Sequence, residues 1–188
     1  MITMQSVLPC FLGVGDMARN IIIEAEKCTG CRLCELACIL YHFIQQNLSN
    51  DIRKFSLPLS RIVVDWVRGQ AFPTLCRHCQ EPPCVDACMA SAIHVGESGD
   101  IVLVDTEKCV GCWMCVMVCP FAAIIQDNQH KKAVKCDKCP SEKIPWCVSW
   151  CPENAIFCGE VEDLIQVRVR NRAGQSAISA HGVVTLRG

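Results

Sequence analysis

Two runs of apolar residues, NIIIEA at 20–25 and DIVLVDT at 100–106, have the alternating or continuous apolar pattern that is typical of short strands. Each run comes just before one of two similar segments, EKCTGCRLCELAC at 26–38 and EKCVGCWMCVMVC at 107–119, so the chain contains an internal repeat. A small residue followed by isoleucine also recurs, and we expect these pairs to be core contacts: Ala92–Ile93, Ala123–Ile124 and Ala155–Ile156.

The two ends of the chain do not share this pattern. Near the start, the apolar run from Val7 to Val14 is too short for a membrane span and follows no Lys or Arg, unlike a secretory signal. We therefore expect a cytoplasmic protein without direct membrane insertion, in which residues 1–19 form an extension and Met17 is a second candidate start. Residues 165–188 carry four Arg and no acidic residue. This tail is either disordered or a docking arm, and its alternating start, IQVRVR, favours the arm.

Cysteine supplies 18 of the 188 residues, and sixteen of the 18 fall into four groups that each end in Cys-x-x-x-Cys. Cys10 and Cys158 stand outside the groups, and we expect neither to be a ligand, although Cys158 lies near the fourth group. The candidate metal ligands are Cys28, Cys31, Cys34 and Cys38 in the first group, Cys76, Cys79, Cys84 and Cys88 in the second, Cys109, Cys112, Cys115 and Cys119 in the third, and Cys136, Cys139, Cys147 and Cys151 in the fourth.

The spacing of these groups indicates iron-sulfur clusters. The first and third groups read C-x2-C-x2-C-x3-C, which is the bacterial ferredoxin run for [4Fe-4S] clusters, and the other two widen the middle gap. Three cysteines in a tight loop can hold three corners of a cubane, while the fourth, on a short following helix, reaches a second cluster. Each group therefore implies a partner group. Gly30 and Gly111 suit a loop that passes close to sulfur, and Pro120 and Pro152 stop the helix after the fourth cysteine.

Other uses of the thiols fit less well. Disulfides are typical of secreted chains, and no signal peptide is present. Zinc is the stronger rival, because C-x2-C pairs build zinc sites, and a zinc-binding interaction module is the alternative from another functional class. A radical S-adenosylmethionine enzyme needs C-x3-C-x2-C, and no group continues in that way.

Several residues among the cysteines invite a role beside the clusters. His78 is not required as a ligand, and we expect it at the surface or as a hydrogen-bond donor near a cluster. We expect Trp113, Trp146 and Trp150 to shield the clusters from water.

Charge and missing motifs narrow the function. A net charge of -1 without a basic patch over the cysteine-rich part does not indicate a nucleic-acid partner. Four oxidised cubanes would lower the net charge to about -9, so a protein partner would present a positive or neutral face. The chain has no dinucleotide-binding or Walker motif and no arrangement typical of hydrolytic catalysis. We therefore expect an electron carrier, not an enzyme.

The order of the groups, short, widened, short and widest, resembles the four-cluster ferredoxin-type subunits of complex redox enzymes over about residues 20–159. That family includes the iron-sulfur subunits of dimethyl sulfoxide reductase, formate dehydrogenase and formate hydrogenlyase, and the small electron-transfer subunit of carbon monoxide dehydrogenase. The segments CRHCQEPPCVDACMASAI and GCWMCVMVCPFAAI look most similar to the carbon monoxide dehydrogenase type. The alternatives within the class are subunits of a tungsten aldehyde oxidoreductase, formate dehydrogenase or hydrogenase complex.

The resemblance implies an α+β fold over residues 20–164, made of two interlocked dicluster units with short strands, short helices and long loops. It pairs motif 28–38 with 136–151, and 76–88 with 109–119, whereas spacing alone equally permits first with second and third with fourth. The implied ligand sets are Cys28, Cys31, Cys34 and Cys151; Cys38, Cys136, Cys139 and Cys147; Cys76, Cys79, Cys84 and Cys119; and Cys88, Cys109, Cys112 and Cys115. No proline follows Cys38 or Cys88, unlike in simple ferredoxins.

The resemblance also implies a function. The subunit would pass single electrons through four [4Fe-4S] clusters between a catalytic oxidoreductase subunit and an acceptor. Carbon monoxide dehydrogenase is the favoured catalytic partner. The acceptor would be a hydrogenase, a flavin oxidoreductase or a ferredoxin.

Overall fold

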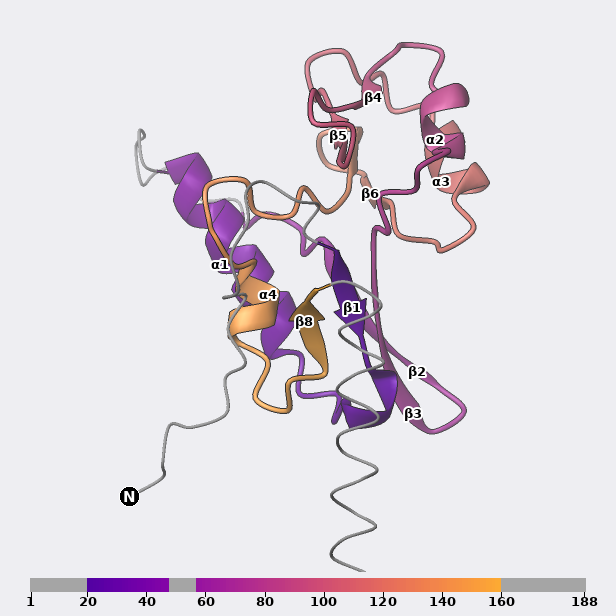
Figure 1. The fold of residues 1–188 in the computed structure, drawn as a ribbon. Coiled ribbons are helices and arrows are strands. Elements are labelled where there is room, and N and C mark those ends of the chain that lie inside the picture. Colours follow the sequence, from indigo (N-terminus) through magenta and orange to yellow (C-terminus); the bar gives the residue numbers. More distant parts are fainter. Residues whose placement is uncertain (1–19, 48–56, 160–188) are drawn as a thin grey trace, which may run out of the picture.

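The computed structural model describes residues 20–47 and 57–159, and these form two lobes (Figure 1). The chain begins in one lobe, leaves it to build a second lobe over residues 76–134, and then returns to the first. We call residues 76–134 the inserted lobe and the other described residues the terminal lobe. Both lobes combine helices with two-stranded antiparallel sheets, so the fold is α+β, as the sequence predicted. The N-terminal extension and the Arg-rich tail lie outside the described residues.

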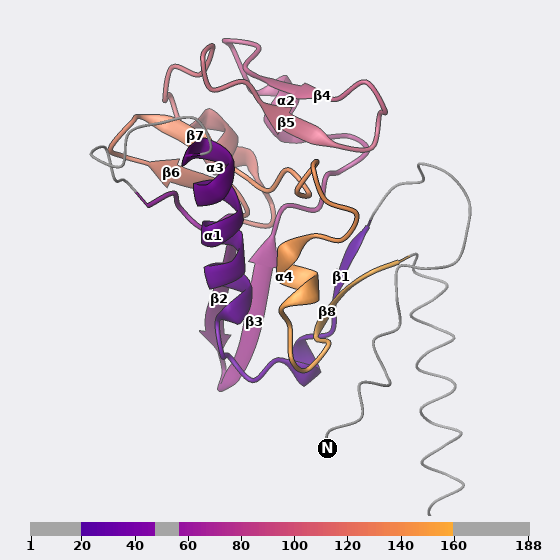
Figure 2. The same cartoon turned by 90° about the vertical axis from the view of Figure 1, so that its left-hand side faces the viewer.

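The terminal lobe joins the two ends of the described chain. Strands β1 and β8 pair antiparallel, with Ile22 opposite Phe157, and α1 packs against α4 (Figures 1 and 2). The first and fourth cysteine groups are thereby brought together. The elements of this lobe are β1 (Ile21–Ile23), a 3-10 turn (Ala25–Lys27), α1 (Leu33–Asn47), β2 (Ile62–Val67), β3 (Gln70–Leu75), α4 (Trp146–Ser149) and β8 (Ile156–Cys158).

The β2–β3 hairpin is an element that the sequence analysis did not predict. It covers the first cysteine group: the backbone N–H of Val64 donates to the Glu35 carboxylate at 2.6 Å, and the Gln70 side chain donates to the carbonyl of Cys28 at 3.3 Å. The alternation of buried Ile62 and Val64 with more exposed neighbours, followed by a turn, is the signal that could have revealed it. The hairpin supplies most of the aliphatic side chains beside the thiols of this lobe.

The inserted lobe holds the second and third cysteine groups. Helices α2 and α3 pack together, and two short hairpins, β4–β5 and β6–β7, link the groups along the chain (Figure 2). Its elements are α2 (Pro83–Asp86), β4 (Ile93–Val95), β5 (Val102–Val104), α3 (Met114–Val118), β6 (Ile125–Asp127) and β7 (Lys132–Val134).

Several predictions about local structure are confirmed. The apolar runs before the first and third groups contain β1 and β5, and all three Ala–Ile pairs are buried. The prediction of short helices is wrong for α1, which runs for 15 residues from Leu33. No Pro or Gly lies between Cys38 and Asn47, so the helix continues for about four turns. The lack of a proline after the last cysteine is not sufficient, because α2 ends at Asp86 although no proline follows Cys88.

Candidate metal centres

Fifteen of the sixteen grouped cysteines gather into four sets, and each set draws its thiols from two groups. Three of the sets line a cavity of their own. The sets are A (Cys28, Cys31, Cys34, Cys151), B (Cys38, Cys136, Cys139, Cys147), C (Cys76, Cys84 and Cys119, to which the sequence prediction adds Cys79) and D (Cys88, Cys109, Cys112, Cys115).

Electrostatic interactions between thiols show that members of set C are close together. The Cys84 thiol is buried, and this burial raises its pKa; the nearby Cys76 and Cys119 thiols raise it further. Three members of set C, from the second and third groups, therefore lie close together.

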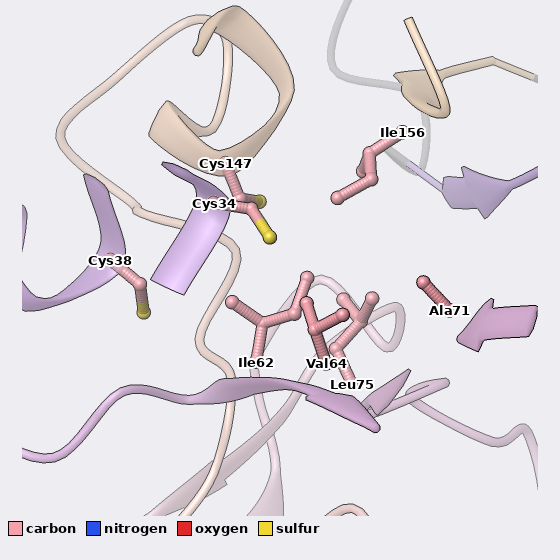
Figure 3. Close-up of a cluster of buried hydrophobic side chains, with 8 residues drawn as sticks. All are labelled: Cys34, Cys38, Ile62, Val64, Ala71, Leu75, Cys147 and Ile156. Atoms are coloured by element: carbon pink, nitrogen blue, oxygen red, sulfur yellow. The ribbon is translucent and has the colours of Figure 1, made fainter. Parts of the chain in front are cut away.

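Helices hold three buried thiols of the terminal lobe. Cys34 and Cys38 lie one turn apart on α1, and Cys147 comes from α4, so Cys34 and Cys147 lie side by side although they belong to different sets (Figure 3). Ile62 and Val64 of the hairpin complete this buried cluster. Sets A and B are therefore neighbours within one core.

Backbone N–H groups point at the sulfur of the last cysteine in each group. In three groups the donor is the alanine of the Ala–Ile pair: Ala92 donates to Cys88 Sγ at 3.2 Å, Ala123 to Cys119 Sγ at 3.5 Å, and Ala155 to Cys151 Sγ at 3.2 Å. In the first group, where α1 continues, the N–H of Arg61 donates to Cys38 Sγ at 3.2 Å instead. Such bonds favour the thiolate and are a means by which proteins tune cluster potential.

The second residue after the first cysteine of every group has a positive φ. These residues are Gly30 (74°), His78 (48°), Gly111 (69°) and Lys138 (59°). The two glycines were expected to leave room for sulfur, but the structure gives a different steric reason. A Cβ on Gly30 would lie 2.7 Å from Cζ2 of Trp66, and a Cβ on Gly111 would collide with the carbonyl oxygen of Lys131. His78 and Lys138 hold the same backbone conformation with a side chain, which is uncommon.

Replacing Gly111 with alanine is expected to disrupt the loop of the third group. The positive φ alone costs about 1–2 kcal/mol, and the collision with the Lys131 carbonyl must be relieved by moving backbone. We expect Gly111→Ala to lower the iron content per chain and the temperature at which visible absorption bleaches. The matched control is Gly99→Ala, which has a φ of 77° but open space around it. An equal effect of both variants would show that the collision has no role.

Burial raises the pKa of several of the thiols. It raises the pKa of Cys34 and Cys136 to about 12 and that of Cys115 and Cys139 to about 11. Without metal these thiols stay protonated at neutral pH. Because iron binds thiolate, loading must displace these protons, and the binding free energy must exceed the cost of doing so.

The spread of the thiols indicates what each cavity can hold. No disulfide joins cysteines of residues 20–47 and 57–159. Within the same residues, no three His, Cys, Asp or Glu side chains are placed to share a single metal ion. Four thiols spaced around a cavity fit a cluster that has an iron atom at each corner, whereas a single zinc ion requires four ligands within about 2.3 Å of one point.

His78, which lies in sequence between the first two cysteines of the second group, carries a buried hydrogen-bond donor. His78 is buried, and its Nδ1 accepts a hydrogen bond from the N–H of Val102 at 3.0 Å, so the ring proton lies on Nε2. Burial, together with the charges of Lys135 and Lys138, lowers the pKa of His78 to about 3, which keeps the ring neutral. Its Nε2 has no hydrogen-bond partner among the described residues. An unmet buried donor costs about 1–3 kcal/mol, and the sulfur of a bound cluster would supply the acceptor.

Sequence reasoning missed a polar group beside set B. Arg61 forms an ion pair with Asp137 at 2.5 Å, and His42 lies 3.7 Å from the same carboxylate. All three side chains line the cavity of set B. Burial and the Arg61 charge lower the pKa of His42 to about 4. No spacing in the sequence marks these residues, because the fold brings them from three separate segments.

The tryptophans differ in how well they can shield a cavity from water. Trp113 lines the cavity of set D, as expected of a shield. Trp146 stacks on Trp150 with ring centroids 5.9 Å apart, but Trp150 is 40% exposed and shields little. Trp66, which was not predicted to have a role, lies over Gly30 in the loop of the first group.

Comparison with known proteins identifies the family of this chain. Residues 67–161 match the family model of a 4Fe-4S dicluster domain. The chain is 35% identical to YsaA of Escherichia coli K12 over 161 residues, which span 83% of this chain and 99% of YsaA. It is 32% identical to the electron transport protein HydN of the same organism, over 83% of this chain and 96% of HydN. It is also 32% identical to the B subunit of anaerobic dimethyl sulfoxide reductase from E. coli K12, over 76% of this chain and 73% of that protein.

The chain belongs to the iron-sulfur electron-transfer subunits of the dimethyl sulfoxide reductase family. The predicted family is thereby confirmed, as is the prediction of 4Fe-4S chemistry. The family model extends from the end of β2 to just beyond β8, so it takes in the second, third and fourth cysteine groups. In the part of the chain that the structure describes, no helix has the length and apolar character needed to cross a bilayer.

Proposed function

We propose that this subunit of the dimethyl sulfoxide reductase family carries four [4Fe-4S] clusters, one on each of sets A to D. The observation that carries the proposal is that three cavities are each lined by four cysteines from two different groups. This is the crossed pattern in which one group supplies three ligands and its partner supplies the fourth. It favours pairing of the first group with the fourth, and of the second with the third.

The four sets form a row in the order A, B, C, D. Cys34 of set A lies close enough to Cys147 of set B to raise its pKa. Cys136 of set B and Cys76 of set C both lie close enough to Lys138 to raise the pKa of its ammonium group. Sets C and D share the core of the inserted lobe. The exposed thiols agree with this order, because Cys31 of set A and Cys112 of set D are exposed and no cysteine of sets B and C is. Sets A and D therefore lie at the ends, where partners can approach.

The function is electron transfer, without catalysis by this subunit. Bound clusters supply reversible one-electron oxidation and reduction. The chain's own residues hold the clusters in a row, donate N–H groups to their thiolates and exclude water from sets B and C. We propose no catalytic residue, since the site residues are metal ligands and their supports.

The catalytic partner is proposed to be an oxidoreductase subunit. Carbon monoxide dehydrogenase, which the sequence favoured, stays a prediction without support from YsaA, HydN or the dimethyl sulfoxide reductase subunit. A complex of the dimethyl sulfoxide reductase type is supported by one of these relatives, which is the B subunit of such an enzyme. A hydrogenase, a flavin oxidoreductase or a ferredoxin stays the predicted acceptor, and a cytoplasmic location stays a prediction.

Metal and sulfide analysis tests the proposal directly. Protein purified without oxygen is expected to contain about sixteen iron and sixteen acid-labile sulfide per chain and to show the electron paramagnetic resonance of reduced cubanes after dithionite. A colourless protein that holds several zinc ions would establish the zinc-module alternative instead. About eight iron per chain, with sulfide to match, would limit the clusters to two of the four sets.

A further inference from the structure

Two lysines are buried where the lobes meet. Lys135 is 3% exposed and Lys138 is 8% exposed, and both belong to the terminal lobe. The Lys135 ammonium donates to the carbonyl oxygen of Val102, in the inserted lobe, and to that of Cys136 at 3.2 Å. The Lys138 ammonium donates to the carbonyl oxygen of Asp100, also in the inserted lobe, at 3.2 Å. Each lysine therefore ties one lobe to the other.

Among residues 20–47 and 57–159, no carboxylate forms an ion pair with either of these ammonium groups. Carbonyl oxygens solvate them, and the charge of Asp100 raises the pKa of Lys138 from beyond ion-pair distance. Lys27, Lys108 and Arg61, in contrast, each have a carboxylate within 4.0 Å. A buried charge is costly unless an opposite charge accompanies it. The two lysines therefore call for anions at the junction.

The backbone at Lys138 carries a second cost. Its φ of 59° matches that of the glycines at the same position in the first and third groups. A residue with a Cβ pays about 1–2 kcal/mol for this conformation, and glycine pays almost nothing. A lysine that is both strained and buried at this position indicates a role beyond packing.

The junction lies between sets B and C. The N–H of Lys138 donates to Cys136 Sγ at 3.4 Å, and its charge also acts on Cys76. The charge of Lys135 lowers the pKa of Cys84 in set C. An oxidised cubane with four thiolates carries a charge of about -2, and reduction adds another negative charge. A cluster on each side would supply the anions that the lysines lack.

We propose that Lys135 and Lys138 are the shared counter-charge of the clusters on sets B and C, and that they raise the reduction potentials of these two clusters above the values that the thiolate ligands alone would give. The inference rests on the proposed function. It goes beyond it by naming two positioning residues that make the middle of the row the favoured place for an electron.

The test is a redox titration monitored by electron paramagnetic resonance on the intact four-cluster protein. Lys138→Gly removes the ammonium and relieves the backbone strain, Lys138→Met removes the charge but keeps much of the side chain, and Lys138→Arg keeps the charge. Lys143→Met is the control, because Lys143 is exposed. We expect Lys138→Gly and Lys138→Met to lower the potential of two clusters, with the reduction equilibrium changed about tenfold, or 59 mV for a one-electron couple. Lys138→Arg and Lys143→Met are expected to change it much less.

Each possible result supports or overturns the role of the lysines as counter-charge. Full iron content with unchanged potentials in Lys138→Gly and Lys138→Met would overturn the inference and leave the proposed function intact. Loss of two clusters in those variants, restored in Lys138→Arg, would support a required counter-charge, whereas equal loss in Lys138→Arg would show that shape matters and charge does not. Too little iron in the parent protein would instead refute the proposed function. Lys135→Met, compared with Lys135→Arg, repeats the test from the other lysine.

Discussion

Removal of iron is expected to unfold both lobes. In the terminal lobe, three of the eight residues in the buried cluster are cysteines, and the partly buried residues around it include three more. The inserted lobe has six residues in its buried cluster, of which two are cysteines. Strands of three residues in two-stranded sheets have little stability of their own. We therefore expect cluster ligation to be the main source of folding free energy, as in other small metal-dependent domains.

Chelation of iron under anaerobic, reducing conditions, followed by amide hydrogen exchange, checks this expectation. Protection of the buried strand residues Ile62, Ile93 and Ile156 should fall by orders of magnitude after iron removal and return when iron and sulfide are added back. The reconstituted sample is the control for irreversible damage. An iron-free chain that keeps slow exchange at these residues would show that aliphatic packing suffices to hold the fold.

The part of this structure that sequence could predict is the part that cysteine spacing and short-range pattern govern. The strands before the first and third groups and the Ala–Ile pairs follow from local sequence, and the structure contains them. The Ala–Ile pairs prove to do more than pack, because the alanine N–H bonds to the last cysteine four residues earlier. A fixed spacing of four residues makes that contact local, so it recurs with the motif.

Contacts between distant segments are the part that sequence could not give. The β2–β3 hairpin covers a cysteine group that lies earlier in the chain, and the bond from Val64 to Glu35 spans 29 residues. The junction lysines gain their significance only from carbonyls of the other lobe, which lie 33 and 38 residues away in sequence. Neither Lys135 nor Lys138 differs in sequence from an ordinary surface lysine. Burial, and the lack of a described carboxylate partner, is what distinguishes them.

Cysteine pairs chosen across and within groups are expected to reveal how the ligands cross. Cys112 and Cys88 line the same cavity but belong to different groups, whereas Cys112 and Cys119 share a group. If set D holds one cluster, Cys112→Ser and Cys88→Ser each lose that cluster, and the double variant loses no more. Cys112→Ser with Cys119→Ser must lose the clusters of both set D and set C. We expect about twelve iron per chain in the first double variant and about eight in the second.

The two double variants are closely matched. Cys88 and Cys119 are both partly buried last cysteines of their groups, and each accepts a bond from an alanine N–H four residues later, so their removal disturbs similar surroundings. Iron and sulfide content, with the number of spins in the reduced sample, measures the outcome. The reverse order of losses would mean that each group binds its own cluster. A loss of two clusters in both double variants would place Cys88 outside set D, as pairing of the first group with the second requires. Only equal losses in Cys112→Ser, Cys88→Ser and their combination fit a cavity in which two groups of the inserted lobe share one cluster.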